Sequence, residues 1–233
     1  MKRQPKTLAD YKPQLPTPRL TRLAFGLVLC TALNLTPGLR AQTLTANLTL
    51  QKDPPSIWKD GIGNGFREDT LDVGFALGAG FGIKEFGSSR YHDLAVASGH
   101  FGWVFSDVCC PDKWCRGNWQ WWIDAFSGGQ YDPKTAYIAG GCTGLEYDFA
   151  TGTRWVPFAA GGVGVSGTNI GRPDLSNTFE FNVEVAGGTH YFFCKDVAAT
   201  FVFHWMHFSD AGMTHPNYGV NTQMFEGGLT WFF

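Results

Sequence analysis

Apolar residues alternate with small or polar residues in a series of short segments between residues 70 and 233. The clearest is TLDVGFALGAGFGI, residues 70–83, in which Val73 and Phe75 fall on the side opposite Asp72. AYIAGGCTGLEYDF and NTFEFNVEVAGGTHYFF, further along the chain, show the same alternation. A period of two residues is typical of a β-strand whose two faces meet different surroundings. The pattern therefore predicts an all-β protein.

Turn-rich breaks divide this part of the chain into eight predicted strands. Among these breaks are DPKT (132–135), ATGT (150–153) and GTNIGRPDLSN (167–177). The second predicted strand alternates weakly, and the fifth contains Pro157, which a central strand accepts poorly. The strands are expected near residues 70–84, 91–105, 118–128, 136–149, 154–165, 178–192, 197–209 and 221–233.

Two kinds of antiparallel barrel are compatible with eight alternating strands. A lipocalin-like soluble barrel turns its apolar side inward around a ligand, whereas an outer-membrane barrel turns it toward lipid. Here the side opposite the aromatic residues consists mostly of Gly, Ala, Asp, Glu, Asn and His, which would make a narrow polar lumen. The C-terminal Phe233 is also typical of bacterial outer-membrane barrels. We therefore predict an eight-stranded antiparallel transmembrane barrel in the bacterial outer membrane.

The N-terminal region has the features of an export signal. Basic residues precede LAFGLVLCTAL (23–33), an apolar stretch too short to span a membrane, and a cleavage site follows at Ala41. The expected organisation is a signal peptide (1–41), a periplasmic lead-in (42–69) and the barrel (70–233). With both barrel ends in the periplasm, the connection after the seventh strand faces the cell exterior.

The composition argues against nucleic-acid binding, and the cysteine spacing argues against a metal site. The 233 residues include only 16% charged side chains and have a net charge of −2, so no basic face for nucleic acid is expected. Without a second CxxC-type pair, no metal site and no cofactor are predicted. His190 and His204, with Glu180 and Glu184, have lumen parity and are expected to form a hydrogen-bonded network.

Cysteines of an exported chain meet an oxidising compartment. After cleavage five would remain, so Cys115 could pair with Cys109 or with Cys110, and an odd thiol is left over. The pairing stays open. The five cysteines are Cys109, Cys110, Cys115, Cys142 and Cys194.

Odd- and even-numbered residues of a strand point to opposite faces, and this parity singles out polar residues in FVFHWMHFSDAGMTHPNYGVN, residues 201–221. His207 and Ser209 share odd numbering with the aromatic residues before them, and Asn221 shares the parity of the last strand's aromatics. All three should therefore face outward near the external rim, where polar side chains in hydrocarbon are costly. Strand residues two apart point the same way, so an imidazole could activate a serine hydroxyl here. The alternative to a catalytic group is that these are ordinary polar residues of the rim, which lie in the hydrated headgroup region.

The stretch HFSDAGMTHPNYGVN resembles the signature of the lipid A 3-O-deacylase family, the PagL-like outer-membrane esterases. The RWVPFAAGGVGV segment, the glycine-rich alternating strands and the aromatic C-terminus extend the resemblance over residues 58–233. It implies an eight-stranded barrel that removes an ester-linked acyl chain from lipid A without a metal. It also implies Ser209 as nucleophile, His207 as general base, and an oxyanion hole formed by the Gly212 amide and the Asn217 side chain.

Two positions depart from the family pattern. Asn221 stands where the family generally has a glutamate, and Asp210 stands where it has an asparagine. An amide oxygen can orient a histidine but brings no charge, and Asp210 is an auxiliary group that could supply it. The expected partner is lipid A or lipopolysaccharide of the outer leaflet, and a homodimer is left open. The alternative functions are a non-catalytic barrel that stabilises the envelope or binds outside partners, and a soluble lipid carrier.

Overall fold

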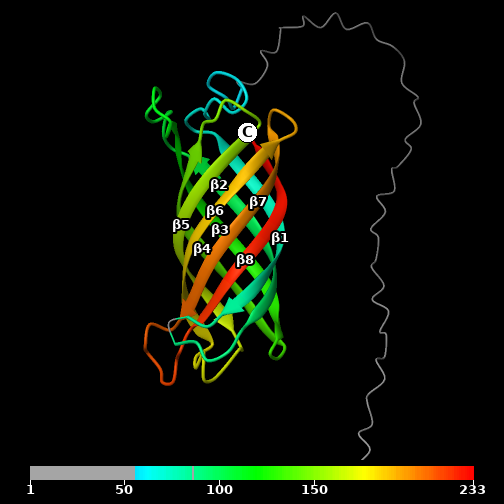
Figure 1. Cartoon of the computed structure of the whole chain (residues 1–233), viewed down its shortest axis with the longest axis vertical. Helices are drawn as coiled ribbons and strands as arrows, with labels where there is room; N and C mark the ends of the chain where they lie inside the picture. Colours follow the sequence, from blue (N-terminus) through cyan, green and yellow to red (C-terminus); the bar gives the residue numbers. More distant parts are fainter. Residues whose placement is uncertain (1–55, 86) are drawn as a thin grey trace, which may run out of the picture. The chain divides into compact units, whose positions relative to one another are not determined.

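The protein folds as a closed antiparallel barrel of eight strands. The structure, a computed structural model, describes residues 56–85 and 87–233, so the predicted signal peptide and its cleavage site lie outside the described residues. Each strand pairs with its neighbour in sequence order, and β1 pairs with β8 to close the sheet (Figure 1). The strands are β1 (Leu71–Ile83), β2 (Asp93–Val104), β3 (Gly117–Asp132), β4 (Ala136–Phe149), β5 (Trp155–Thr168), β6 (Phe179–Phe192), β7 (Val197–Ser209) and β8 (Val220–Phe232).

The predicted barrel class and its eight strands are confirmed, with small differences at the strand ends. The third strand was expected to stop at residue 128 but continues to Asp132, because its glycines pair regularly with β2 and β4. Pro157 is tolerated in β5 because pairing with β4 begins only at Phe158. The missing N–H of Pro157 therefore removes no hydrogen bond between β4 and β5.

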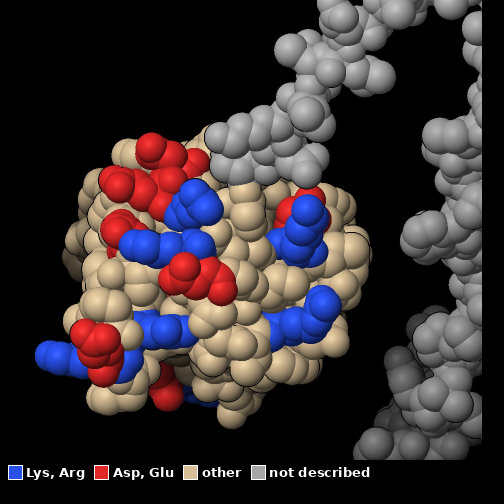
Figure 2. Space-filling view, turned by 90° about the horizontal axis from the view of Figure 1, so that it is seen from above, with Lys and Arg blue, Asp and Glu red and all other residues tan. Residues whose placement is uncertain are grey.

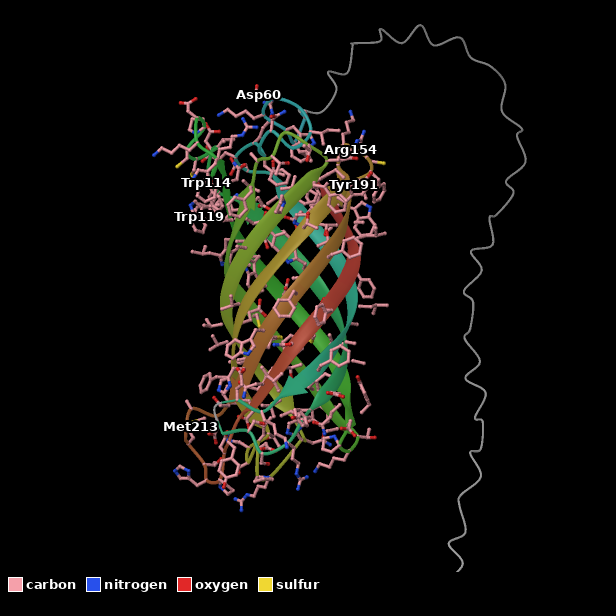
Figure 3. All side chains as sticks on the ribbon, viewed as in Figure 1. Asp60, Trp114, Trp119, Arg154, Tyr191 and Met213 are labelled. Atoms are coloured by element: carbon pink, nitrogen blue, oxygen red, sulfur yellow. The ribbon has the colours of Figure 1, made fainter. Side chains whose placement is uncertain are left out.

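The two ends of the barrel differ. We call the end with both chain termini of the barrel, near Leu71 and Phe232, the terminal end, and the opposite end the loop end. In Figure 3, Trp119 and Tyr191 lie toward the terminal end and Met213 lies at the loop end. Four connections form the loop end: residues 84–92, 133–135, 169–178 and 210–219.

The outer surface is apolar and is bordered by aromatic rings. Exposed tryptophans stand near the terminal end and exposed tyrosines near the loop end, with aliphatic and phenylalanine side chains between them. Such girdles are typical of barrels that cross a lipid bilayer. The tryptophans are Trp103, Trp114, Trp119, Trp121, Trp155 and Trp231, and the tyrosines are Tyr91, Tyr131, Tyr137 and Tyr218.

The lumen, which was expected to be polar, also contains two apolar clusters, one toward each end. Toward the loop end, an apolar cluster includes Met206, Phe208 and Val220 from the strands, and Ile170 and Leu175 from the connection 169–178. Glycines leave space for other members of this cluster, since a Cβ on Gly162 would meet Trp122 and one on Gly140 would meet Phe126.

The segment before β1 closes the terminal end. The ring of Trp58 stacks on Phe66 with centroids 4.7 Å apart, and it meets Phe192 edge-on at the same distance. Phe66 stacks on Phe232 at 5.1 Å, and the Trp58 indole N–H donates to the Lys195 carbonyl at 2.6 Å. The part of the predicted lead-in that the structure describes is therefore an aromatic plug.

Charged side chains are scattered over the terminal end. Acidic and basic groups are interspersed there in the view of Figure 2. Lys59 and Asp107 form an ion pair at 2.5 Å, and the hydrogen bond from Lys59 lowers the pKa of the Asp107 carboxyl. Asp107 belongs to the connection 105–116, which also carries three cysteines. All five cysteines of the described residues are free thiols, so neither pairing of Cys115 is present.

One buried carboxylate joins the connections at the loop end. Asp174 accepts hydrogen bonds from the Ser89 amide at 2.7 Å and the Ser89 hydroxyl at 3.0 Å, and it contacts His92 Nε2 at 3.0 Å. Its backbone carbonyl accepts from the Gly219 amide at 2.9 Å. Asp174 thus ties the connections 84–92 and 210–219 to its own.

Replacing Trp58 with alanine should destabilise the barrel strongly, because it removes the central ring of the aromatic plug. We expect the free energy of unfolding to fall by about 3–5 kcal/mol, the usual range for a buried aromatic residue. Urea unfolding in lipid vesicles, followed by the band shift of heated and unheated samples on gels, measures the change. Trp114, which is 91% exposed, provides the control: Trp114→Ala should leave the midpoint unchanged. Equal midpoints for the two variants would contradict a structural role of the plug.

Candidate active site

The outward faces of β7 and β8 carry the residues singled out in the sequence. Phe201 and Phe203 are exposed, while their even-numbered neighbours in β7 point inward. His207 and Ser209 follow on the outward side and are partly exposed. Asn221 lies opposite His207 in the β7–β8 register and is buried. The strand ladder thus brings Asn221 to the same outer rim as His207, which lies 14 positions earlier in the sequence.

Hydrogen bonds link the three side chains in a row. His207 Nε2 lies 3.1 Å from Ser209 Oγ, and His207 Nδ1 lies 2.8 Å from Asn221 Oδ1. The imidazole plane stacks nearly parallel on the Trp205 ring, with centroids 6.3 Å apart. A serine hydroxyl, an imidazole and an amide oxygen in such a row have the geometric pattern of a serine hydrolase triad.

A backbone carbonyl fixes the orientation of the Asn221 amide. Asn221 Nδ2 donates to the Glu85 carbonyl at 2.7 Å. Because an amide nitrogen only donates and a carbonyl only accepts, this bond turns Oδ1 toward the imidazole. His207 then donates from Nδ1 and keeps its Nε2 lone pair for the serine proton. A triad in which asparagine presents its nitrogen would hold the opposite tautomer and lose its base.

A depression of about 500 Å³ opens beside this row at the loop end. Its wall consists of Val183 on β6, Trp205 on β7, and residues of the connection 210–219. The side chain of Val183 is exposed on the outer surface. The depression is therefore continuous with the apolar belt of the barrel.

The Gly212 amide, expected to stabilise an oxyanion, already has an acceptor. It donates to Asp210 Oδ1 at 3.0 Å, while Thr214 donates its amide to Asp210 Oδ2 at 2.8 Å. Burial raises the pKa of Asp210, but the hydrogen bonds from Thr214, Asn217 and Gly212 outweigh it and hold that pKa below its usual value. Asp210 therefore shapes the connection that it begins.

Asn217, the second predicted oxyanion donor, lines the depression. Its Nδ2 makes a long contact of 3.4 Å with Glu180 Oε2. Glu180 was expected in a lumen network with Glu184, His190 and His204, but it lies at the loop end against Asn217. Only Glu184 and His204 of that set approach each other, at 3.8 Å. The strand register separates residues that parity alone had grouped.

Two contributors to the site carried no sequence signal. Glu85 acts through its main chain, so no side-chain pattern could reveal it. Gly219 has a positive φ of 77°, and a Cβ on it would lie 2.7 Å from His207 Cε1. The glycine therefore leaves room for the imidazole, a requirement that appears only when the two are placed in space.

The sequence matches a known family over the region that carries this site. The family model described as lipid A 3-O-deacylase (PagL) matches residues 110–230, more than half of the chain. The chain belongs to the lipid A 3-O-deacylase (PagL) family. A search of curated proteins gave no match.

Solved structures agree on the fold. The crystal structure of the outer membrane enzyme PagL matches with a TM-score of 0.50 and 18% identity, covering 67% of this chain and 97% of that one. Neisserial surface protein A matches with a TM-score of 0.53 and 13% identity, covering 71% of this chain and 100% of that one. At these identities the likeness shows the fold alone. Together with the family, it identifies a barrel of the bacterial outer membrane.

Gly219→Ala should displace the imidazole and slow any reaction of Ser209. A misplacement of about 1 Å can cost about 10²-fold in rate, so labelling of Ser209 by a fluorophosphonate should slow by about that factor. Mass spectrometry of the labelled peptide measures the rate. Gly171→Ala is the matched control, since Gly171 has a similar φ of 80° but its nearest neighbouring atom would be 3.8 Å away. Equal slowing in both variants would attribute the effect to backbone strain.

Proposed function

We propose that this family member is an outer-membrane esterase that hydrolyses an ester-linked acyl chain of lipid A. The observation that carries the proposal is the hydrogen-bonded row of Ser209, His207 and Asn221 on the outward rim. Ser209 is the nucleophile, His207 the general base, and Asn221 the residue that orients the base.

The reaction proceeds through an acyl-enzyme. Ser209 Oγ attacks the acyl carbonyl carbon while its proton passes to His207 Nε2. The tetrahedral intermediate collapses, the bond to the sugar oxygen breaks, and His207 returns the proton to that oxygen. Water, deprotonated by His207, then attacks the acyl-serine, and the fatty acid leaves as Ser209 regains its proton.

Asn217 is the better placed of the two oxyanion donors. Its amide lies in the wall of the depression and has two N–H groups. Besides the hydrogen bond to Asp210, it makes only a long contact of 3.4 Å with Glu180, so exchanging this contact for a developing oxyanion costs little. The Gly212 amide would first have to leave the Asp210 carboxylate, a stronger charge-assisted bond. We therefore assign the main stabilisation of the oxyanion to the Asn217 side chain.

The position of the depression fits a lipid substrate. Val183 and Trp205 join it to the apolar belt, where an acyl chain of an outer-leaflet lipid already lies. The acyl chain can reach Ser209 without leaving hydrocarbon, while its ester stays near the headgroup zone. The favoured partner is thus lipid A in its own membrane.

Asn221 supports catalysis by geometry and not by charge. The Glu85 carbonyl keeps its oxygen toward the imidazole, which preserves the tautomer that serine activation needs. No charge from Asn221 stabilises the imidazolium, so turnover is expected to be slow compared with a triad that ends in a carboxylate.

Ser209→Ala should abolish fatty-acid release from lipopolysaccharide. Loss of a serine nucleophile costs several orders of magnitude, so release should fall by at least about 10³-fold. Free fatty acid from the full chain in detergent micelles is the readout. Ser127, an exposed serine on β3, is the control, and Ser127→Ala should keep full activity. Equal release by wild type and Ser209→Ala would leave the non-catalytic barrel as the function.

Asn221→Ala should lower kcat more than it raises KM, because it frees the imidazole without changing the lipid-facing wall. We expect kcat to fall by about 10²-fold, which is about 2.7 kcal/mol of transition-state stabilisation. Steady-state kinetics over lipopolysaccharide concentration separate the two constants. Gln223→Ala, two residues along the same side of β8, should leave both unchanged. A rise in KM alone would assign Asn221 to substrate binding.

A further inference from the structure

The middle of the lumen, between the two apolar clusters, is a polar chamber. It encloses a cavity of about 60 Å³, lined among others by Glu146 and His190. A single water needs about 10–15 Å³ by this measure, so the cavity has room for an ion together with a few waters. Thr200, whose hydroxyl contacts the His190 imidazole, also lines it.

Negative charge predominates in this lumen. The eight strands, all within the described residues, contain no lysine and no arginine. Buried carboxylates are costly unless a cation or a proton compensates them. The only lumen side chains of these strands that can become cationic are His100, His190 and His204. The buried carboxylates of the strands are Asp72, Glu146, Asp148, Glu180, Glu184 and Glu226.

Three of these groups converge on one point near the terminal end. His190 Nε2 lies 3.7 Å from Glu146 Oε1 and 3.9 Å from Asp148 Oδ1, and one ligand atom from each residue falls within 4.8 Å of the others. These separations exceed the 2.7–3.2 Å of a typical N–H···O hydrogen bond. Ligands bound at about 2.1 Å to one tetrahedral ion lie about 3.4 Å apart, so closing on an ion needs only a small movement.

The imidazole of His190 is held in place for such a role. Its Nδ1 lies 2.8 Å from Thr200 Oγ1, so Nε2 points to the carboxylates. Phe158 stacks on the ring at 4.8 Å, and Phe232 of the terminal cluster meets it edge-on at 5.4 Å. A hydrogen bond to the far nitrogen is the usual support of a metal-bound histidine.

Asp148 supplies an independent sign of a missing partner. The side chain is 2% exposed, and neither of its carboxylate oxygens has a hydrogen-bond partner. Buried polar atoms are nearly always satisfied, and a charged one left alone is especially costly. One of these oxygens lies within 4.8 Å of ligand atoms of Glu146 and His190.

We propose that Glu146, Asp148 and His190 bind a divalent transition-metal ion, for which Zn²⁺ is the representative. One imidazole nitrogen with two carboxylates suits zinc and its neighbours better than calcium or magnesium, which prefer oxygen alone. Waters in the cavity complete the coordination. The ion connects β4 to β6 across β5 and stiffens the terminal half of the barrel. It is independent of the Ser209 site.

The register explains why the sequence predicted no metal. Glu146 and Asp148 lie on β4 and His190 on β6, more than 40 positions away, without a recognisable ligand motif. Val156 pairs with His190, and Phe158 pairs with Asp148, so the single strand β5 brings them together.

Zinc binding by the full chain, refolded in detergent micelles, tests this site. Cys109, Cys110 and Cys115 are first replaced by serine, because clustered thiols would bind zinc themselves. After incubation with Zn²⁺ and gel filtration, elemental analysis should find one zinc per folded chain. Asp148→Asn and His190→Gln should lower the zinc affinity by at least about tenfold. His204→Gln, a lumen histidine beside Glu184, is the matched control and should retain the ion.

Thermal unfolding gives a second readout. Zn²⁺ should raise the Tm of the parent and of His204→Gln but not that of Asp148→Asn. In EDTA, Asp148→Asn should be at least as stable as the parent, since it removes an uncompensated buried carboxylate. A folded parent that retains neither Zn²⁺ nor Co²⁺ would overturn the proposal, and so would equal zinc retention by Asp148→Asn. If both variants fail to fold, the visible spectrum of Co²⁺ bound to the parent decides, because nitrogen and oxygen ligation without sulfur is required.

Discussion

Closure of the strand ladder is the constraint on which this molecule depends. Within hydrocarbon each backbone N–H and C=O must find a partner inside the protein, and pairing of β1 with β8 leaves no open edge. Once the ladder is closed, the side chains have only two directions, outward or inward. Lipid contact, lumen chemistry and the row at the rim all follow from that division. His207 and Asn221 face each other because the antiparallel register of β7 and β8 makes them direct neighbours.

The rim holds His207 more firmly than Ser209. His207 pairs with both neighbouring strands, whereas Ser209 pairs with Phe181 of β6 but lies beyond Phe208, the last β7 residue that pairs with β8. Asp174 and Asp210 organise the connections above them through main-chain hydrogen bonds. The orientation of Asn221 depends on the main chain, because the Glu85 carbonyl determines which atom of its amide meets the imidazole. A neutral amide can hold a useful tautomer only under that condition.

Periodicity was sufficient to predict the barrel. Apolar and polar residues alternate because the two faces of each strand meet different surroundings. It also placed His207, Ser209 and Asn221 on one side, since parity survives small errors in strand ends. It could not predict contacts that depend on register. Glu180 was grouped with His190 by parity, yet they lie at opposite ends of β6. Nor could it foresee the plug, because Trp58 and Phe66 come from a segment with no alternation. The site roles themselves remain predictions from the family resemblance and the geometry.

The aromatic plug has a consequence for permeability. A solute crossing the lumen would have to displace Trp58 and Phe66 at one end and the apolar packing around Phe208 at the other. Each barrier is a set of closely packed side chains, so the barrel does not make the outer membrane permeable through its lumen. Antibiotics and detergents that enter through wide channels would find no passage here.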